Sequence, residues 1–259
     1  MRLVTCLAAA AAVVSIGVGA AAAKDWTTVR IAMDTTYPPF ESLDASGQIV
    51  GFEKDIADAL CKQMKVTCEF TNQAWDGIIP GLLANKYDAI LSSMSITEER
   101  KQQIDFSDKI YQTPPAIAVP TDSALKGVTA EDLKGITLGA QTSTTHANYA
   151  SAKFPESELK IYPSPDEYKL DLQSGRIDAA IDDIVVLDEW TKSDAGKCCK
   201  VLGVLPTDPV INGAGAGVGI RKEDTDLKEM FNKAIAAIRA DGTYKAISDK
   251  YFSFDVYGS

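Results

Sequence analysis

The sequence predicts an α/β protein made of two lobes. Strand-like runs alternate with helical patterns along the chain, and this alternation is typical of parallel sheets covered by helices. One helix-to-strand unit occurs twice, at 83–91 and again at 173–181, so each lobe is expected to contain one copy. The length of 259 residues suits two compact units, which would have roughly 100 to 130 residues each.

The two copies of this unit share the same order of residues. An apolar helical stretch ends at a residue that tolerates a left-handed conformation, Asn85 in one copy and Gly175 in the other, and a cation follows. An Asp-Ala pair comes next, starting at Asp88 and at Asp178, and leads into a short apolar strand. Coincidence is the alternative, since such junctions are common, but the matched order favours one unit used twice.

Composition and charge exclude several classes of protein. Hydrophobic residues make up 46% of the chain and charged residues 24%, which is ordinary for a globular protein and excludes a disordered or collagen-like chain. Asp and Glu number 36 against 26 Lys and Arg, which gives a formal charge of -10. Because no surplus of cations is available to neutralise phosphates, we expect no binding to nucleic acid.

The first 23 residues have the pattern of a secretory signal peptide. Arg2 supplies the only charge before an apolar run that ends in four alanines, Ala20 to Ala23, ahead of Lys24. A membrane anchor is the alternative, but the run consists mostly of small residues. A lipid anchor would need a cysteine at the cleavage point, and Cys6 lies too early. We therefore expect cleavage after Ala23 and soluble export, and no later stretch could span a bilayer.

Four cysteines follow the predicted cleavage point. Cys61 lies late in a helical pattern and Cys68 starts an extended segment, so a disulfide that joins helix to strand is expected in an exported protein. A bond between the adjacent Cys198 and Cys199 would be strained, which leaves free thiols or intermolecular pairing as alternatives. The chain has one histidine and no Cys-x-x-Cys spacing, so we expect no metal site and no cofactor.

Two breaks divide the chain into its predicted lobes. Turns that contain proline at 113–115 and 207–209 interrupt regular structure, and we interpret both as crossovers. The first lobe would then be discontinuous, with residues 24–112 and 211–259, and the second lobe would be the insertion 113–210.

Polar residues follow one predicted strand in each predicted lobe. The run 29–33 leads into the polar segment 34–37, and the run 136–140 leads into 141–145. In parallel sheets, ligands bind beyond the carboxyl ends of the strands, where loops and helix N-termini meet. These two segments are therefore expected to contribute to one ligand site.

Four motifs occur in a characteristic order along the chain. They are Asp34-Thr-Thr-Tyr37-Pro-Pro-Phe40, Gly51-Phe52-Glu53, Trp75-Asp-Gly-Ile-Ile-Pro80 and Ser92-Ser-Met-Ser95-Ile-Thr-Glu-Glu-Arg100. With them the chain resembles the periplasmic polar and basic amino-acid-binding proteins of ABC importers, above all the lysine/arginine/ornithine- and histidine-binding proteins. The similarity also covers 175–179 and 241–252, and so extends over nearly the whole chain after the predicted signal peptide.

This resemblance implies a fold and a function. The fold is the type II periplasmic-binding-protein fold, with two Rossmann-like lobes joined by a two-stranded hinge. The function is that of a non-catalytic, monomeric receptor in the periplasm that encloses a basic amino acid and delivers it to an inner-membrane ABC permease. Closure would follow because ligand groups come from both lobes, so that a bound molecule favours the shut state.

A ligand carboxylate is best held by a bidentate guanidinium together with amides of a helix N-terminus. Arg100 lies in the first turns of a helix that Ser95 could cap, with Glu98 placed as in a capping box. The resemblance implies that Arg100 clamps the ligand carboxylate with help from Ser95, while Thr145 offers its amide from the second lobe. An exposed helix cation is the alternative interpretation of Arg100.

A ligand ammonium needs a carboxylate partner. Asp183 follows the apolar strand 179–181, and the matching Asp of the family binds the α-amino group. Ser93 would add an acceptor to the same ammonium. The adjacent Asp182 would point to the opposite face of a strand, which favours a structural or solvated acid.

The side chain of the ligand is expected to meet Asp34, because a carboxylate at the far end of the pocket selects for a cation. An Asx cap of the following turn is the alternative for Asp34. Tyr37 and Trp75 would enclose the ligand side chain by stacking and cation–π contact. Trp75 precedes Asp76, which could cap the next helix and so keep the indole near the cleft.

Three further residues are weaker candidates. Ser92 and Gln141 are expected to contact the ligand side chain. His146 stands where many relatives carry Gln, which could alter ligand choice or make affinity depend on pH; a hydrogen-bonded structural histidine is the alternative. Gln141 also departs from the family pattern, where an aliphatic residue is frequent.

Two rival functions share the same scaffold. One is an exported enzyme such as a cyclohexadienyl dehydratase, for which Asp34, Asp183 and His146 would be the acid–base groups. The other is an opine receptor, which would keep the Arg100 clamp. Opines carry a substituted α-nitrogen, and Asp183 suits a primary ammonium better.

Overall fold

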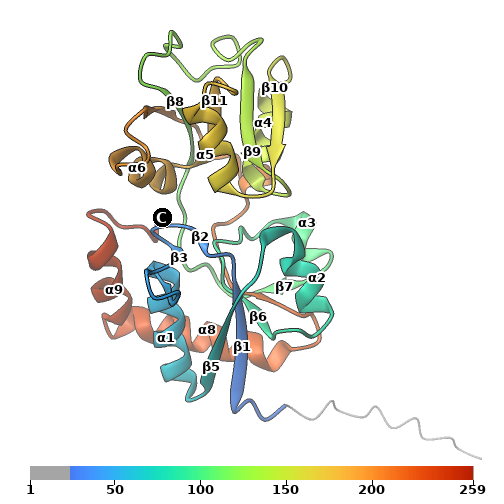
Figure 1. Cartoon of the computed structure of the whole chain (residues 1–259). Helices are drawn as coiled ribbons and strands as arrows, with labels where there is room; N and C mark the ends of the chain where they lie inside the picture. The colour runs from blue at the N-terminus through green and yellow to red at the C-terminus, as the bar shows by residue number, and fades with distance from the viewer. Residues whose placement is uncertain (1–23, 259) are drawn as a thin grey trace, which may run out of the picture.

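The computed structural model of the chain describes residues 24–258, so the predicted signal peptide lies outside the described residues. Two five-stranded sheets lie one above the other, each with its own helices (Figure 1). We call each sheet with its helices a lobe. The mixed α/β architecture with two lobes confirms the predicted fold class. Within residues 24–258, no helix is both long enough and apolar enough to cross a membrane.

The first lobe forms around a mixed sheet. Its strands are, in spatial order, β5 (Thr67–Asn72), β1 (Thr28–Met33), β6 (Ala89–Ile90), β13 (Gly219–Ile220) and β7 (Asp105–Phe106). Its helices are α1 (Phe52–Met64), a 3-10 turn η1 (Trp75–Gly77), α2 (Ile78–Leu83), α3 (Glu98–Lys101), α8 (Thr225–Ala240) and α9 (Thr243–Tyr251). A small antiparallel sheet of β2 (Thr36–Tyr37), β3 (Glu41–Leu43) and β4 (Ile49–Val50) follows β1.

The second lobe repeats the plan. Its strands are, in spatial order, β10 (Glu158–Tyr162), β9 (Thr137–Gln141), β11 (Ala179–Asp183), β8 (Pro115–Pro120) and β12 (Cys199–Val204). Its helices are α4 (Thr145–Lys153), α5 (Pro165–Gln173), α6 (Ile184–Lys192) and α7 (Pro209–Asn212).

The strands are parallel only in part of each sheet. In the first lobe β1 is parallel to β5 and β6, whereas β13 is antiparallel to β6 and β7. In the second lobe β9 is parallel to β10 and β11, whereas β8 is antiparallel to β11 and β12. β8 and β13 are the strands that the chain enters after crossing from the other lobe, and each runs against the parallel set.

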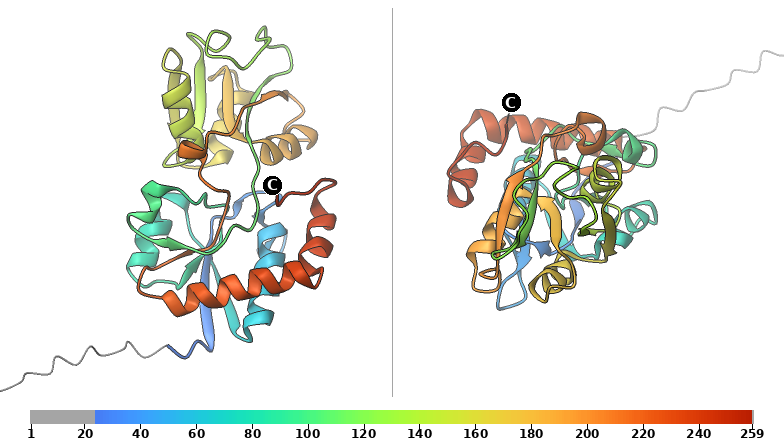
Figure 2. Two further views of the ribbon diagram at one scale, coloured as in Figure 1. Left: turned by 180° about the vertical axis from the view of Figure 1, so that it is seen from behind. Right: turned by 90° about the horizontal axis from the view of Figure 1, so that it is seen from above.

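The chain passes between the lobes twice, once between β7 and β8 and once between β12 and β13, as the rear view in Figure 2 shows. The predicted lobe boundaries, 112/113 and 210/211, fall within these two connections. The second boundary cuts through α7 (Pro209–Asn212). The precise division into lobes therefore stays a prediction.

The repeated unit found in the sequence has the same backbone geometry in both lobes. The residues that end the two helices have left-handed φ, 57° at Asn85 and 68° at Gly175. Asp88 and Asp178 each donate their N–H to a backbone carbonyl of the neighbouring parallel strand, β1 and β9 respectively, and each accepts the N–H of that same strand residue on its carboxylate. Matched sequence thus gives matched hydrogen bonds, which confirms one unit used twice.

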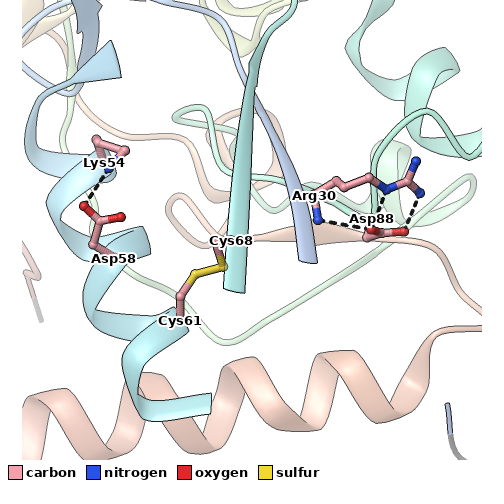
Figure 3. Close-up of a disulfide and its surroundings, with 6 residues drawn as sticks. All are labelled: Arg30, Lys54, Asp58, Cys61, Cys68 and Asp88. Atoms are coloured by element: carbon pink, nitrogen blue, oxygen red, sulfur yellow. Dashed lines mark hydrogen bonds and ion pairs between the residues drawn. A yellow bond between two sulfur atoms is a disulfide. The ribbon is translucent and has the colours of Figure 1, made fainter. Parts of the chain in front are cut away.

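The predicted disulfide is present. Cys61 in α1 and Cys68 in β5 are bonded, and the bond joins helix to strand as expected (Figure 3). Cys198 and Cys199 are free thiols whose sulfurs lie 2.6 Å apart.

Candidate ligand-binding site

Two neighbouring cavities lie between the lobes. We call them the first and the second cavity. The first is lined by ten of the predicted residues: Asp34, Tyr37, Trp75, Ser92, Ser93, Ser95, Arg100, Gln141, Thr145 and His146. The second contains the remaining one, Asp183, and shares Tyr37, Ser93, Ser95, Thr145 and His146 with the first. The fold thus brings all eleven residues together from segments far apart in the sequence.

Arg100 is placed by the short helix α3. Thr97 is the N-cap of this helix, and its hydroxyl accepts the N–H of Arg100 at 3.2 Å. The prediction that Ser95 is the cap is wrong. Ser95 forms an extended β-bridge with Ala216 instead, so the chain turns into the helix only after Ser95.

The guanidinium of Arg100 is buried without an anionic partner. It donates to the carbonyl oxygens of Ser95 at 2.9 Å and of Ser143 at 3.1 Å, and it lies over the Trp75 ring at 5.2 Å. Among the described residues, no carboxylate forms an ion pair with it. Burial lowers the pKa of Arg100 to about 10, so the group stays charged at neutral pH. A buried charge of this kind is stabilised when an anion arrives.

The second lobe presents a helix N-terminus to the same space. α4 begins at Thr145, and its N-cap Thr144 accepts the N–H of Ala147 at 3.1 Å. The Thr145 hydroxyl lies 3.5 Å from the Ser95 hydroxyl of the first lobe. The first N–H groups of a helix have no partner within the helix, so the start of α4 can donate to an anion held by Arg100. Thr144 lines the first cavity as well and is not among the predicted residues.

Asp183 ends strand β11 and caps the following helix α6. Its carboxylate accepts the N–H of Val185 at 2.7 Å and the hydroxyl of Thr113. Burial raises the pKa of Asp183 to about 7. The carboxylate is thus close to its titration point at neutral pH, and a cationic partner would favour its ionised form.

Asp182 is not the solvated acid that the alternation of a strand allows. It is 2% exposed, and its carboxylate accepts the hydroxyls of Tyr37 and Tyr168. His146 Nδ1 lies 3.2 Å from the same group. The prediction allows either a structural or a solvated acid, and the geometry fits the structural acid. The sequence does not reveal that its partners include residues of the ligand site.

Asp34 lies buried at the carboxyl end of β1. One carboxylate oxygen accepts the hydroxyl of Thr36 at 2.9 Å, and the other accepts the N–H of Trp75 at 3.2 Å. Its own N–H donates to the Ser92 hydroxyl at 2.8 Å. Burial raises the pKa of Asp34 above its ordinary value. Asp34 therefore belongs to a turn, as the Asx alternative has it, and lines the first cavity as well.

The carboxylate that accepts a hydrogen bond from the start of the turn η1 is that of Asp34, not that of Asp76. The structure has no side-chain cap at η1 or at α2, whose N-cap is Gly77. The predicted cap by Asp76 is therefore wrong. The indole Nε1 of Trp75 donates across the cleft to the carbonyl of Ser143 at 3.3 Å, so the ring does lie beside the cleft.

Gln141 ends strand β9 and is 6% exposed. Its amide donates to the carbonyl of Pro163 at 3.1 Å. The side chain also hydrogen-bonds Asp34 across the cleft, which lowers the pKa of that carboxyl, so Gln141 links the two lobes at the wall of the first cavity.

A buried pair of glutamates lies behind the first cavity and is absent from the predicted site. Glu41 is 1% exposed, lines the first cavity, and accepts the hydroxyls of Ser92 at 3.4 Å and Ser93 at 3.2 Å. Glu53 accepts the N–H of Ser93 at 2.8 Å. Burial raises the pKa of Glu41 well above its usual range and that of Glu53 to about 8. The sequence contains a signal for both glutamates. Glu41 directly follows the motif 34–40 and Glu53 ends the motif 51–53, and both motifs carry the resemblance.

Comparison with known proteins agrees with this geometry. The L-arginine-binding protein of Pseudomonas aeruginosa is 45% identical over 234 residues, 89% of this chain and 90% of that protein. The histidine-binding periplasmic protein of Escherichia coli K12 is 43% identical over 233 residues, 89% of each chain. The solved structure of an ancestral arginine-binding protein bound to glutamine superposes with a TM-score of 0.82 at 34% identity and covers 89% of this chain and 100% of that one.

The family model of the bacterial extracellular solute-binding proteins, family 3, matches residues 29–254. This match extends over both lobes and includes every residue that lines the two cavities. The chain therefore belongs to the bacterial extracellular solute-binding proteins of family 3.

Proposed function

We propose that this protein is a periplasmic receptor that encloses a basic L-amino acid between its lobes and delivers it to an inner-membrane ABC permease. The observation that carries the proposal is the buried guanidinium of Arg100, which has no carboxylate partner among the described residues. A group of this kind suits a ligand that brings its own carboxylate. The relatives named above bind arginine and histidine, which supports an amino acid as the ligand.

The ligand carboxylate would lie between Arg100 and the start of α4. The guanidinium comes from the first lobe and the amide of Thr145 from the second, so one carboxylate would contact both. Ser95 lies between them, since its carbonyl accepts from Arg100 and its hydroxyl is 3.5 Å from that of Thr145. The bound anion would thus replace water at both groups and draw the lobes together.

The ligand ammonium would lie in the second cavity. Asp183 and Ser93 both line this cavity, and an ionised Asp183 is the carboxylate that a primary ammonium requires. Since Asp183 belongs to the second lobe and Ser93 to the first, the ammonium would also bridge the lobes.

The ligand side chain would extend into the first cavity toward Asp34. Tyr37 and Trp75 line this cavity and supply aromatic faces, and Asp34 and Glu41 supply buried carboxyl groups. Such surroundings favour a side chain with an aliphatic stem and a cationic end. Micromolar affinity needs only about 8 kcal/mol of binding free energy, which one guanidinium clamp, one buried carboxylate and aromatic contact can supply.

Export to the periplasm is part of the same proposal. Residues 1–23 would serve as a cleavable signal peptide, and the released receptor would act as a monomer without a catalytic step. The Cys61–Cys68 disulfide is in keeping with an oxidising compartment. N-terminal sequencing of periplasmic protein is expected to start at Lys24, and retention of residues 1–23 would contradict cleavage.

Isothermal titration calorimetry tests the ligand assignment. Arginine, lysine, ornithine and histidine are compared with agmatine, which lacks the carboxylate of arginine, and with Nα-acetylarginine, which lacks the primary ammonium. We expect at least one basic amino acid to bind and both analogues to fail. Binding of agmatine would contradict the role of Arg100.

The same preparation separates the rival functions. Octopine and nopaline carry a substituted α-nitrogen, and preferential binding of either would identify an opine receptor. Release of a product from a cyclohexadienyl amino acid during incubation would identify an enzyme. We expect neither result.

A further inference from the structure

Asp182 is the centre of a hydrogen-bond cluster at the wall of the ligand site. Its carboxylate accepts the hydroxyls of Tyr37 and Tyr168 and the N–H of Asp183, the last at 2.7 Å. The Nδ1 atom of His146 lies 3.2 Å away. The partners come from β2, α5, α4 and its own strand β11. A residue that is 2% exposed thus has its oxygens occupied by donors and lacks contact with solvent.

Only one of these partners belongs to the other lobe. Tyr168, His146 and Asp182 all lie in the second lobe, whereas Tyr37 lies in β2 beyond the first strand of the first lobe. The hydrogen bond from Tyr37 to Asp182 therefore crosses the cleft. Because Tyr37 lines both cavities, this bond fixes the orientation of a ring that forms part of the ligand site.

The protonation states in the cluster follow from its geometry. A carboxylate only accepts hydrogen bonds, so both tyrosines must donate. Burial raises the pKa of Tyr37 and of Tyr168 well above the ordinary value, so both hydroxyls keep their protons. Burial lowers the pKa of His146. The neutral imidazole then donates from Nδ1 to Asp182, which leaves its Nε2 as an acceptor.

Two cations complete the surroundings of the cluster. Lys169 on α5 is buried, which lowers its pKa, while the charge of Asp182 acts in the opposite direction. The charge of Arg100 acts on His146 and helps to keep the imidazole neutral. Asp182 is therefore, with Asp166, one of two carboxylates that act on a buried cation, and it orients three side-chain donors, Tyr37, Tyr168 and His146.

We propose that Asp182 is a positioning residue of the ligand site, which sets the orientation of Tyr37 and the tautomer of His146 and favours the closed arrangement of the lobes. The proposal rests on the proposed function for its effect on ligand binding. Without Asp182 the Tyr37 ring would lose its tether and the closed state its cross-lobe bond. Apparent affinity falls when the binding-competent state is less populated. Since the oxygens of Asp182 are already occupied, the loss would be similar for basic and neutral ligands.

A double-mutant cycle tests the link between Asp182 and Tyr37. Asp182→Asn keeps the shape of the side chain but replaces one acceptor oxygen by an N–H₂ group, and Tyr37→Phe keeps the ring but removes the hydroxyl. Calorimetry with arginine is expected to show a loss of affinity of about tenfold for each variant and no further loss for the double variant. Additive losses, which would give about a hundredfold in the double variant, would overturn the proposal, as would unchanged affinity of Asp182→Asn.

Tyr168→Phe is the matched control. It removes the other phenol donor of Asp182, but that hydrogen bond stays within the second lobe. We expect a lower unfolding temperature and an affinity for arginine within about twofold of the unmodified protein. A loss as large as that of Tyr37→Phe would show that the cluster acts through the stability of its own lobe, which would overturn the cross-lobe role.

Nitrogen NMR of the imidazole without ligand supplies a measurement that does not depend on the proposed function. In the unmodified protein at pH 7.5 we expect His146 to be neutral and protonated at Nδ1, and in Asp182→Asn to lose this single tautomer. The same tautomer in both proteins would overturn the proposal. If no amino acid binds the unmodified protein, the proposed function fails, whereas the NMR result still decides about Asp182.

Discussion

Asp34 and Asp183 are two buried carboxylates that face the cleft from opposite lobes, and they differ in how they are held. Asp34 follows strand β1 and bonds a hydroxyl and one backbone N–H. Asp183 ends strand β11, caps a helix and has a pKa raised to about 7 by burial. The second carboxylate is therefore more sensitive to the arrival of a cation near neutral pH, whereas the first lies in the cavity proposed for the ligand side chain.

The comparison teaches that strand ends in different positions of the two lobes would serve different ends of one ligand. Each carboxylate lies at the carboxyl end of a strand, where parallel sheets present their ligand groups. Asp183 would bind the ammonium that all α-amino acids share, and Asp34 the side chain by which they differ. Affinity and selectivity would then have separate origins, and mutations should separate them.

Removing the guanidinium that is proposed to clamp the ligand carboxylate should have the largest effect. Arg100→Ala is expected to weaken binding of every amino acid by about 1000-fold, or roughly 4 kcal/mol, because the loss of one partner of a buried charge pair costs roughly 2 to 5 kcal/mol. Calorimetry with arginine and with a neutral amino acid measures this. Retained binding of either would mean that the ligand carboxylate lies elsewhere.

Asp183→Asn should lower the affinity for all amino acids alike, by about 100-fold, since a buried ionic partner of the ligand ammonium is lost. The side chain stays similar in shape and can still accept from Val185. Titration of arginine and glutamine in parallel checks this, with the circular dichroism spectrum as a control for folding. A loss confined to arginine would reverse the roles given to the two carboxylates.

Asp34→Asn should instead weaken the binding of basic amino acids more than that of neutral ones. We expect about a 10- to 30-fold loss for arginine and lysine, which is the size of a hydrogen bond to a charged group, and little change for a neutral amino acid. Competition between arginine and glutamine measures the ratio. Equal losses for both would show that Asp34 acts through the backbone of Trp75 rather than on the ligand side chain.

The pKa of Asp183 predicts that ligand affinity depends on pH. The ammonium binds the ionised carboxylate, so affinity should be full above pH 7 and fall as the pH drops through about 7. Between pH 8 and pH 6 this amounts to about tenfold, and below pH 7 binding should release up to one proton per ligand as Asp183 ionises. The dependence should vanish in Asp183→Asn. If affinity still depends on pH in this variant, the titrating group would be His146 or Glu53 instead.

The smallest effect on binding is expected for the disulfide. Cys61 and Cys68 lie at the end of α1 and the start of β5, and β5 runs parallel to β1 so that its start is remote from Asp34. Replacing both by serine should leave affinity unchanged and lower the free energy of unfolding by about 2 to 3 kcal/mol. Urea unfolding measures the change in stability, and calorimetry measures the affinity. Weaker ligand binding would show that the junction of α1 and β5 affects the cleft.

Features governed by neighbours in sequence could be predicted. The repeated junctions at Asp88 and Asp178 depend on residues within one helix turn and one strand, and the Cys61–Cys68 bond depends on a helix and strand joined by a short loop. Arg100 and the residues around it could be predicted because they form an ordered motif. The caps by Ser95 and Asp76 were wrong because pairing with Ala216 and contact with Asp34 come from distant segments.

The sequence alone therefore determined the two-lobed α/β architecture, the family, the disulfide and eleven of the residues that line the two cavities. Only the tertiary structure decided that Asp182 bonds Tyr37 across the lobes and that Glu41 lies buried beside Ser93. The physical reason is that helical and strand periodicity fixes which face a side chain occupies. The partner that this face meets depends on the packing of whole elements against each other.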